Sequence, residues 1–327
     1  MYLIRGQNNI NLFKKRFPEV QLSATIGNFD GLHLGHKSIL KSIKDDAKNR
    51  NSKTIVFFTE PHASEYFAKK NNNIEISPPR LSPWREKVKL LDEEGIDFGF
   101  FLKFNDTLRS MSPESFIEEI LGSLDLVSLK VGDDFRFGAD RAGDFKFLKN
   151  WGDINKVSIS NTPTFLHEEK RVSSTWIRES LLKSNFSLAS KLLGRPYTFS
   201  GKVVEGQQLG RTIGVPTANL WIPKQKLPIS GVYAVKCLLE KEIYKGIANM
   251  GVRPTVNGTK PVLEVHIFDF NRDIYSKRLE VEFKHKIRDE KKFKDLNLLK
   301  SQIQKRYINS QRVIKIKNYG HKLQRYA

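Results

Sequence analysis

The chain has 327 residues, more than one ordinary compact domain contains, and this length favours about two domains. Hydrophobic residues make up 39% of the chain and aromatic residues 11%, which excludes disorder along its whole length. The 56 Lys and Arg against 36 Asp and Glu give a formal net charge of +20, which would attract polyphosphates, RNA or an anionic surface without distinguishing among them.

Cysteine content and hydropathy predict the compartment. The single cysteine, Cys237, cannot form an internal disulfide, and no apolar run reaches the roughly 20 residues of a membrane-spanning helix. The opening residues also lack the charged start and long apolar core of a signal peptide. We therefore expect a cytoplasmic protein without a membrane partner. Basic residues are dispersed as on solvated helix faces, so no specific nucleic-acid partner is expected, while the sequence allows an oligomer.

The first part of the chain alternates between strand-like and helix-like segments. Apolar runs predict strands at 21–26, 54–58, 98–101 and 126–131. Helix-like patterns lie at 35–47, 83–94, 113–121 and 174–193. Such alternation indicates an α/β domain in which crossover helices connect the strands of a parallel sheet.

After Gly194-Arg-Pro196 the pattern changes to short β runs separated by Gly, Pro and Asn. The predicted strands are 199–204, 232–239, 244–249, 261–268 and 278–283. They suit a small, mainly antiparallel β-barrel, closed by a helix predicted at 296–312. We therefore expect one domain at 1–190 and a second at 195–327.

A glycine- and histidine-containing segment, Gly27-Asn-Phe-Asp-Gly-Leu-His33-Leu-Gly-His36, ends the first predicted strand and opens a helix. Its glycines let the backbone approach a phosphate chain, and the helix N-terminus supplies N–H donors. Nucleotidyl transfer needs such donors, together with a metal, around the α-phosphate. A histidine pair for a metal is disfavoured by the spacing of three, and two surface histidines are the other alternative. We expect His33 and His36 to bind phosphate.

A second glycine-rich segment begins the barrel, Gly201-Lys-Val-Val-Glu-Gly206-Gln-Gln-Leu-Gly210-Arg211-Thr-Ile-Gly214-Val-Pro-Thr217-Ala-Asn219. Its backbone N–H groups can face phosphates, and the side-chain oxygens of Thr217 and Asn219 suit Mg²⁺. Simple hairpin turns are the alternative, which the Pro-Thr-Ala-Asn continuation disfavours. Further on, Glu264 and His266 share one face of a predicted strand, either as a surface pair or with Glu264 as a general base.

These motifs together resemble those of the bifunctional riboflavin kinase/FMN adenylyltransferases of prokaryotes, also called FAD synthetases. The resemblance covers nearly the whole chain. It is also carried by Arg80-Leu81, Phe104-Asn105, Ser112-Pro-Glu-Ser-Phe116, Val131-Gly-Asp-Asp-Phe-Arg-Phe-Gly138, Val172-Ser-Ser-Thr-Trp-Ile-Arg178, Gly231-Val-Tyr-Ala234 and Asn249-Met-Gly251. It implies a Rossmann-like nucleotidyltransferase domain of the HxGH type and a riboflavin kinase barrel. It also implies that ATP and Mg²⁺ are used to phosphorylate riboflavin to FMN and to adenylylate FMN to FAD, releasing pyrophosphate.

The resemblance also implies roles for individual residues. In the first domain the ATP site would be lined by Gly27, Asn28, Phe29, Asp30, Gly31, His33 and His36. Ser174 and Thr175 would close over it, and Arg178 would stabilise the leaving pyrophosphate. Adenine and flavin would be held by Asp134, Phe135, Phe137 and Gly138. In the second domain Glu264 would activate the ribityl hydroxyl. From the residues alone, Ser174 and Thr175 are also a helix N-cap, and Arg178 a solvated charge.

One segment departs from the family pattern. Phe-x-Pro-His-Pro is replaced by Thr59-Glu-Pro-His62-Ala63, which removes an aromatic surface for the flavin at Thr59. The neighbouring Phe57 or Phe58 could replace it, although strand alternation points one of them into the core. This departure leaves one alternative open, an enzyme that retains only the kinase activity. A second alternative, from another class, is a flavin-sensing, basic nucleic-acid-binding protein with an inherited enzyme fold.

Overall fold

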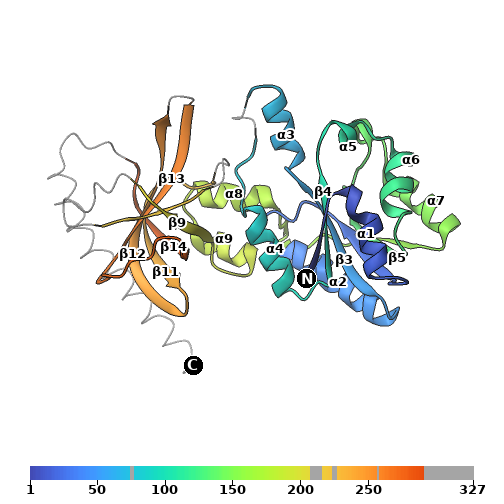
Figure 1. Cartoon of the computed structure of the whole chain (residues 1–327), viewed down its shortest axis with the longest axis horizontal. Helices are drawn as coiled ribbons and strands as arrows, with labels where there is room; N and C mark the ends of the chain where they lie inside the picture. The colour runs from blue at the N-terminus through green and yellow to red at the C-terminus, as the bar shows by residue number, and fades with distance from the viewer. Residues whose placement is uncertain (74–76, 207–215, 223–226, 256–257, 291–327) are drawn as a thin grey trace. The chain divides into compact units, whose positions relative to one another are not determined.

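The computed structural model describes residues 1–73, 77–206, 216–222, 227–255 and 258–290 (Figure 1). Contacts between residues divide the chain into two units, Met1–Trp176 and Ile177–Ala327. No helix of the described residues is long and apolar enough to cross a membrane. The predicted helix at 296–312 and the loop residues Gly210, Arg211 and Gly214 lie outside the described residues.

The first unit is built on a six-stranded sheet in the order β1-β4-β3-β2-β5-β6, with every neighbouring pair parallel. Its strands are β1 (Tyr2–Arg5), β2 (Leu22–Ile26), β3 (Lys53–Glu60), β4 (Phe98–Lys103), β5 (Leu126–Gly132) and β6 (Ser158–Thr162). The predicted parallel sheet is confirmed. β1 and β6 fall outside the predicted strands because β1 is short and β6 is mostly polar; both lie at the edges of the sheet, where hydrophobic patterning is weak.

Helices cover both faces of this sheet (Figure 1). The helices of this unit are α1 (Ile10–Arg16), α2 (Leu34–Asn49), α3 (Ala63–Lys70), α4 (Trp84–Glu93), α5 (Asp106–Ser110), α6 (Pro113–Phe116) with its π-helical continuation η3 (Ile117–Leu121), and α7 (Phe145–Asn155). On one face, α2 and α4 pack against Val56 and Phe58 of β3. On the other, α1, α6, η3 and α7 pack around Ile55 and Phe57. Burial of both faces explains the continuous apolar run of β3.

The strand order reverses at β2. From β2 the chain proceeds through β3 to β4 on one side, and β5 with β6 lies on the other. In open parallel sheets, ligands bind outside the carboxyl ends of the strands at such a reversal. The loops that follow β2 and β5, residues 27–33 and 133–138, leave the sheet there. The fold therefore brings two of the predicted motifs to one edge of the sheet.

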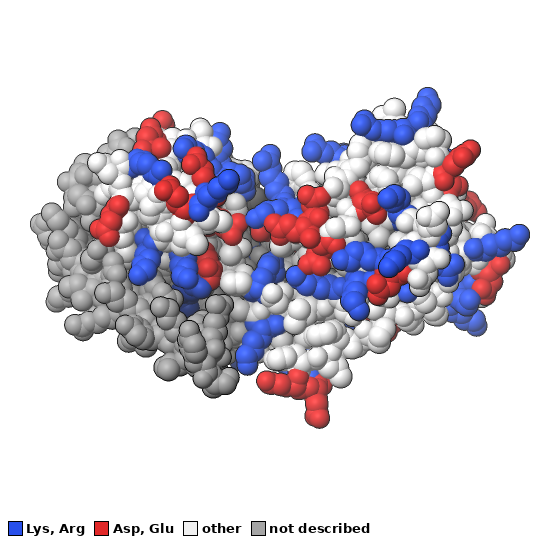
Figure 2. Space-filling model, turned by 90° about the horizontal axis from the view of Figure 1, so that it is seen from below, with Lys and Arg blue, Asp and Glu red and all other residues white. Residues whose placement is uncertain are grey.

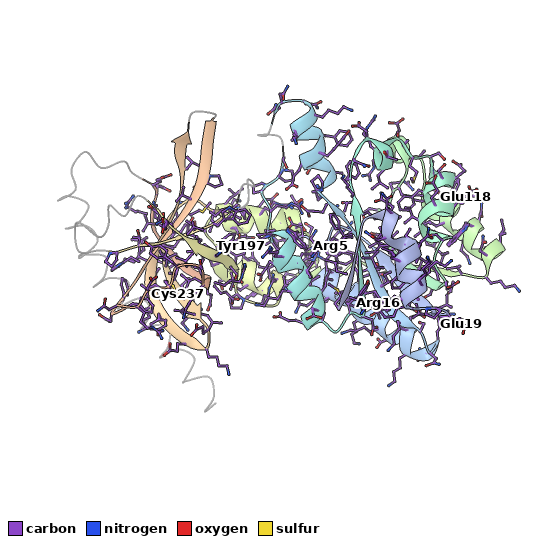
Figure 3. The ribbon with its side chains drawn as sticks, in the orientation of Figure 1. Arg5, Arg16, Glu19, Glu118, Tyr197 and Cys237 are labelled. Atoms are coloured by element: carbon purple, nitrogen blue, oxygen red, sulfur yellow. The ribbon has the colours of Figure 1, made fainter. Side chains whose placement is uncertain are left out.

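The second unit contains a closed antiparallel barrel in the order β10-β13-β12-β11-β14-β9. Its strands are β9 (Thr198–Val204), β10 (Ala218–Leu220), β11 (Gly231–Leu239), β12 (Glu242–Thr255), β13 (Gly258–Ile267) and β14 (Arg278–Arg288). The predicted barrel is confirmed, with β10 as an additional three-residue strand. Cys237 is buried in β11 (Figure 3), where burial raises the pKa of its thiol to about 12.

The prediction of one helix over 174–193 is wrong. The segment forms α8 (Ser174–Leu182) and α9 (Phe186–Leu193), separated by a turn in which Ser184 has φ of 57°. Asn185 caps α9 by accepting a hydrogen bond from the N–H of Leu188 at 3.1 Å. The cap of α8 also differs from the prediction, because the hydroxyl oxygen of Ser173 accepts the N–H of Trp176 at 3.2 Å.

Helix α9 packs on the barrel through Phe186. This buried ring lies edge-on to Tyr233, with centroids 5.6 Å apart, and parallel to Phe283 at 6.3 Å. Tyr197 completes the aromatic cluster by contacting Phe283 at 5.9 Å. The helix is therefore part of the core of the second unit.

A fragment of residues 177–327 should unfold cooperatively, whereas a fragment of residues 195–327 should be less stable because it lacks Phe186. Loss of a buried Phe side chain costs about 3–5 kcal/mol, a large share of the stability of a small domain. Urea unfolding followed by circular dichroism measures the difference, with Phe186→Ala in the longer fragment as the matched variant. Equal unfolding midpoints for the three proteins would show that α9 does not stabilise the barrel.

Candidate functional site

The loop between β2 and α2 has a strained backbone. Phe29 and Leu32 have φ of 48° and 40°, and Gly31 between them has φ of 82°. Bulky residues rarely adopt this left-handed region, and strain of this kind concentrates at functional sites. Both Phe29 and Leu32 are buried in the core formed by α2, α4 and β3. Their burial holds the strained loop in place.

Asp30 fastens this loop to residues 81 and 82. Its buried carboxylate accepts hydrogen bonds from the N–H of Leu81 at 3.1 Å and of Ser82 at 3.1 Å. The Ser82 hydroxyl in turn accepts the N–H of Gly31 at 3.0 Å, and Ser174 donates to the Asp30 carbonyl oxygen at 2.9 Å. Three of the predicted ATP-site residues are thus joined in one network. Within it, the Asp30 carboxylate binds backbone donors, which is a structural contribution to the site.

The rings of His33 and His36 stack with centroids 3.6 Å apart and planes 17° apart. His33 is the N-cap of α2, and its Nδ1 accepts the N–H of His36 at 3.3 Å. A nitrogen that accepts carries no proton, so the ring proton of His33 lies on Nε2. Burial, followed by the charges of His33 and Lys87, holds the pKa of His36 well below its usual value. The pair therefore offers a neutral imidazole at His36 and the Nε2 edge of the ring at His33.

The altered segment after β3 contributes to the same loop. The hydroxyl of Thr59 donates to Oδ1 of Asn28 at 2.9 Å, so Thr59 positions a predicted ATP-site residue. Phe57 and Phe58 are both buried, on opposite faces of the sheet. The hypothesis that one of them replaces the missing aromatic surface is therefore wrong.

His62 caps helix α3. Its Nδ1 accepts the N–H of Ser64 at 3.1 Å, and its own N–H donates to Glu65 at 3.2 Å. Burial, then the nearby Arg80, lowers the pKa of His62 to about 4. These contacts give His62 a structural role at the start of the helix.

A charge cluster lies close to these groups and consists of the buried Arg80 and Lys87 and the half-buried Glu60 and Glu65. Arg80 is 2% exposed, and its Nη2 lies 3.1 Å from Glu60 and 2.7 Å from Glu65. Burial lowers the pKa of Arg80, but the two carboxylates outweigh it and raise the pKa overall. Burial raises the pKa of Glu60, against the opposing effect of Arg80. The cluster leaves no motif in the sequence because its members come from β3, α3, a loop and α4.

The loop after β5 carries two carboxylates held by the short hairpin of β7 (Leu166–His167) and β8 (Lys170–Arg171). Arg171 lies 3.1 Å from the Asp134 carboxylate and 3.7 Å from that of Asp133. The Thr164 hydroxyl donates to Asp133 at 2.8 Å and lowers the pKa of that carboxyl. Asp134, a predicted ligand-binding residue, is therefore exposed but ion-paired.

The aromatic residues of this loop differ in accessibility. Phe137 is buried and packs on Phe116 at 5.4 Å and on the half-buried Phe135 at 5.7 Å. Gly138 has φ of 74°, and an added Cβ would approach Pro113 to 2.8 Å, so the position requires glycine. Burial favours a structural role for the Phe137 ring and leaves Phe135 as the more accessible aromatic side chain.

In the second unit, Glu264 lies directly between Asn219 and Asn249 across neighbouring strands β10, β13 and β12. Side chains of directly opposite residues share a face and lie about 4.5–5.5 Å apart at Cβ. Leu263 and Val265 are buried, so the half-buried Glu264 points to the other face, outside the barrel. The register brings Glu264 together with the amides of Asn219 and Asn249, which lie 45 and 15 residues before it in the sequence; of these two, only Asn219 belonged to the predicted site.

Contacts with neighbouring segments position this group. Gly206 packs against the side chain of Asn219, where an added Cβ would collide with the amide. Gly201 lies within β9, close to Leu220, and so belongs to the barrel wall. The Nδ1 of His266 lies 2.8 Å from the carbonyl oxygen of Pro216, which makes Nδ1 the donor and fixes the residue that precedes Thr217.

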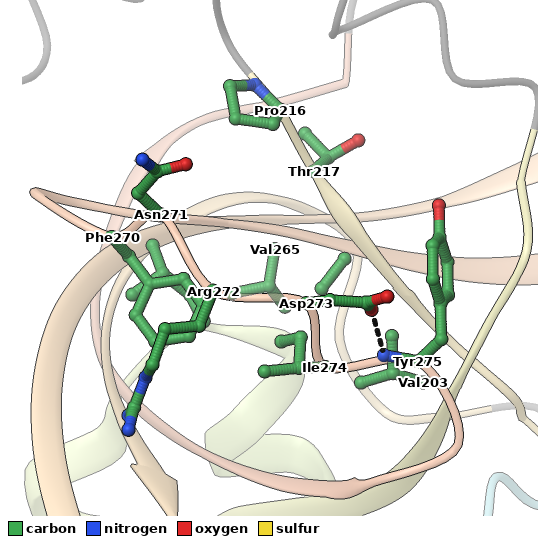
Figure 4. A pocket seen from close by; sticks show the side chains of 12 residues that line it. Val203, Pro216, Thr217, Val265, Phe270, Asn271, Arg272, Asp273, Ile274 and Tyr275 are labelled. Carbon is green, nitrogen blue, oxygen red and sulfur yellow. Dashed lines mark hydrogen bonds between the residues drawn. The ribbon is translucent and has the colours of Figure 1, made fainter.

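Thr217 lines a pocket of about 290 Å³ at one side of the barrel (Figure 4). The other lining residues are Val203, Pro216, Ala218, Val265, Ile267, Phe270, Asn271, Arg272, Asp273, Ile274 and Tyr275. Arg272 lies over Phe270, with its guanidinium carbon 5.2 Å from the ring centroid, and the N–H of Tyr275 donates to Asp273 at 2.9 Å. The pocket joins an apolar floor to polar side chains, as small-molecule sites do.

Two family models match the chain. The model described as FAD synthetase matches residues 18–176, and the one described as riboflavin kinase matches residues 193–314. A protein of Haemophilus influenzae, described as a bifunctional riboflavin kinase/FMN adenylyltransferase, is 42% identical over 307 residues, which cover 93% of this chain and 96% of that one. The Escherichia coli K12 protein with the same description is 41% identical over 305 residues and covers 93% and 95%.

A solved structure shares the whole fold. It is described as a macrolide-efflux protein from Streptococcus pneumoniae, has 28% sequence identity and a TM-score of 0.74, and covers 92% of this chain and 95% of that one. The likeness supports the architecture of both units over nearly their full length.

Asp30→Ala should lower the free energy of unfolding of the first unit by about 2–4 kcal/mol, because two buried N–H groups lose their charged acceptor. Urea unfolding followed by the fluorescence of Trp84 and Trp151 measures this change. Asp45→Ala, at an exposed position of α2, is the control and should leave the unfolding free energy within about 0.5 kcal/mol. An unchanged value for Asp30→Ala would mean that other contacts hold the loop.

Proposed function

The chain belongs to the family of bifunctional riboflavin kinase/FMN adenylyltransferases, and we propose that it adenylylates at the loop 27–36 and phosphorylates beside Glu264. The protein phosphorylates riboflavin to FMN and adenylylates FMN to FAD, so its substrates and products include ATP, riboflavin, FMN and FAD. The observation that supports the first site most strongly is the position of the strained histidine loop at the reversal of the sheet. The domain limits of 1–190 and 195–327 stay a prediction from the sequence, while contacts group residues 177–193 with the barrel.

Adenylyl transfer joins a phosphate oxygen of FMN to the α-phosphorus of ATP and expels pyrophosphate. Negative charge grows on the α-phosphate oxygens, and positioned donors stabilise it. His33 would donate from Nε2, and His36 would donate from the adjacent ring. Ser174 supports the loop through its bond to Asp30, while the exposed Thr175 offers a hydroxyl. We assign stabilisation of the pyrophosphate to Arg178 on the basis of its place in the family motif.

The flavin of FMN needs an aromatic surface that Thr59 does not provide. Phe67, on α3, is 41% exposed and contacts both Tyr66 and Phe104 edge-on, with centroids 5.3 and 6.1 Å away. We infer that this aromatic group, which follows β3 and β4 at the same edge of the sheet, takes part in holding the isoalloxazine ring. Asp134 and Phe135 would then contact the ligand from the loop after β5.

Riboflavin phosphorylation needs a base for the attacking ribityl hydroxyl and a site for ATP. Glu264, between the amides of Asn219 and Asn249, supplies the carboxylate. The hydroxyl of Thr217 opens on the pocket of Figure 4, which we assign to the nucleoside part of ATP. The glycine-rich loop would then cover the phosphates.

Mg²⁺ fits the oxygen donors beside this pocket. The hydroxyl of Thr217 and the amide oxygen of Asn219 are hard ligands, and Gly206 fixes the position of the amide. The described residues contain no group of three His, Cys, Asp or Glu side chains that could hold a metal by themselves. We therefore propose that Thr217 and Asn219 hold Mg²⁺ together with phosphate oxygens of ATP, whose charge the ion would neutralise.

Two alternatives are separated by one experiment: incubation with riboflavin, ATP and Mg²⁺, followed by chromatographic separation of FMN and FAD. Formation of both products supports the assignment, while FMN alone would indicate that only the kinase is active. Formation of neither product, together with steeply salt-dependent, sequence-specific RNA binding, would indicate the nucleic-acid-binding alternative.

On the face seen in Figure 2, basic and acidic side chains are interspersed, which is typical of a solvated surface.

His36→Ala should abolish FAD formation from FMN and leave riboflavin phosphorylation nearly unchanged, because the histidine loop belongs to the first unit. Both rates are measured in the same preparation, which makes the kinase activity the control for folding. His285→Ala, at an exposed position of β14, is the matched histidine variant and should keep both rates. Equal loss of both activities in a folded His36→Ala protein would contradict independent sites.

Glu264→Gln should slow riboflavin phosphorylation by about 10²–10⁴-fold, because the amide keeps the size of the side chain but cannot accept the proton of the hydroxyl. ATP binding and FAD synthesis from supplied FMN should change little. Single-turnover phosphorylation beside steady-state adenylylation measures both effects, with the exposed Glu240→Gln as control. Near-normal phosphorylation by Glu264→Gln would exclude Glu264 as the base.

A further inference from the structure

Lys87, on α4, places an ammonium group in the interior of the first unit. Its side chain is 0% exposed, and its Nζ has no hydrogen-bond partner within the part of the chain that the structure describes. The ammonium lies over the face of Phe58, 5.1 Å from the ring centroid. Burial of an ammonium without a hydrogen-bonding partner destabilises a folded protein, so an apolar side chain of similar length would suit this position better.

Lys87 adds a second positive charge to a group of one guanidinium and three carboxylates, and burial outweighs the attraction of these carboxylates. The pKa of Lys87 is affected by the charges of Arg80, Glu60, Asp30 and Glu65. The charge of Lys87 in turn lowers the pKa values of His36 and His62. Arg80 already pairs with Glu60 and Glu65, and backbone N–H groups bind the Asp30 carboxylate. Burial, then repulsion from Arg80, lowers the pKa of Lys87 to about 8 despite these carboxylates. Glu86 is the other buried charged residue on α4.

The charge of Lys87 also acts on the histidine loop. Lys87 and His36 interact electrostatically, and the positive charge of Lys87 disfavours a second positive charge on the imidazole. In a site of low dielectric constant, a fixed positive charge behind a hydrogen-bond donor stabilises an anion in front of it. A phosphate bound at the loop would therefore be attracted by the ammonium through the neutral ring.

We propose that Lys87 is a positioning residue for FMN adenylylation, which acts through His36: its buried ammonium lies over Phe58, in the core that holds the histidine loop, and adds positive potential where charge grows on ATP. This inference rests on the proposed function of loop 27–36 and names a residue outside the family motifs discussed above. It gives a function to an ammonium at a position where it reduces stability.

The test compares Lys87→Met, which removes the charge, with Lys87→Arg, which keeps it, and with Lys89→Met at an exposed position of the same helix. We expect kcat/KM for FMN adenylylation to fall about 10- to 100-fold in Lys87→Met and to remain within about threefold in the other two variants. Riboflavin phosphorylation in the same preparations should be unchanged. The melting temperature of Lys87→Met at pH 7 should equal or exceed that of the unaltered protein.

The pH dependence gives an independent measurement. As the pH rises through about 8 the ammonium loses its proton, so adenylylation by the unaltered protein should decline there. Lys87→Met should lack this decline, and Lys87→Arg should move it above the accessible range. Between pH 8 and the ordinary lysine pKa, the unfolded chain binds more protons at this residue than the folded one. The stability advantage of Lys87→Met is therefore largest below pH 8 and disappears as the pH rises towards the ordinary value.

Three results would overturn the proposal: unchanged adenylylation and pH profile in Lys87→Met, equal loss of activity in Lys87→Arg, or loss of both activities with a lowered melting temperature. The last two would make Lys87 a packing residue. The outcome for His36→Ala separates this inference from the assignment of the loop. If His36→Ala abolishes FAD formation and Lys87→Met does not affect it, only the role of Lys87 is lost.

Discussion

The hydrogen bonds from Leu81 and Ser82 to the Asp30 carboxylate are the constraint on which the first site depends. Together with the burial of Phe29 and Leu32, they hold the backbone between β2 and α2 in the left-handed region at these two residues. The same bonds draw the segment after α3 against the loop and bring Arg80 and its carboxylates into the interior. One aspartate thereby connects the phosphate-binding motif to the charges beneath it.

The two units create their sites by different means. In the first, the reversal of strand order gathers loops at one sheet edge, so the functional groups stand on loops and a helix N-terminus. In the second, strand register does the same work, because hydrogen-bonded neighbours place Glu264 between Asn219 and Asn249. The site in the first unit includes strained loop residues, whereas the site in the second unit is set by the hydrogen-bonded pairing of barrel strands. The proposed site of adenylylation thus lies on loops at a sheet edge, and that of phosphorylation on the paired strands of a barrel.

Hydrophobic periodicity was sufficient to predict the parallel sheet and the barrel, and the motifs predicted sites at the histidine loop and Glu264. Contacts made through tertiary packing leave no pattern in the local sequence. Lys87 resembles a surface lysine of an amphipathic helix, and Thr59 resembles a position that has lost its aromatic contact with the flavin. The break between α8 and α9 was within reach, since Ser184-Asn185 is a common stop and cap sequence. Apolar periodicity on both sides concealed it.

Because Glu264 lies on the outer face of β13, the proposed reacting group and the residues of the barrel core occupy opposite faces of the same strand. Leu263 and Val265, its neighbours along the strand, face the opposite way and form the interior. Selection for tolerance of heat can therefore act on the interior apolar residues while the reacting groups keep their spacing. An interior exchange between apolar residues of similar volume should therefore change the stability of the barrel more than the spacing of its reacting groups.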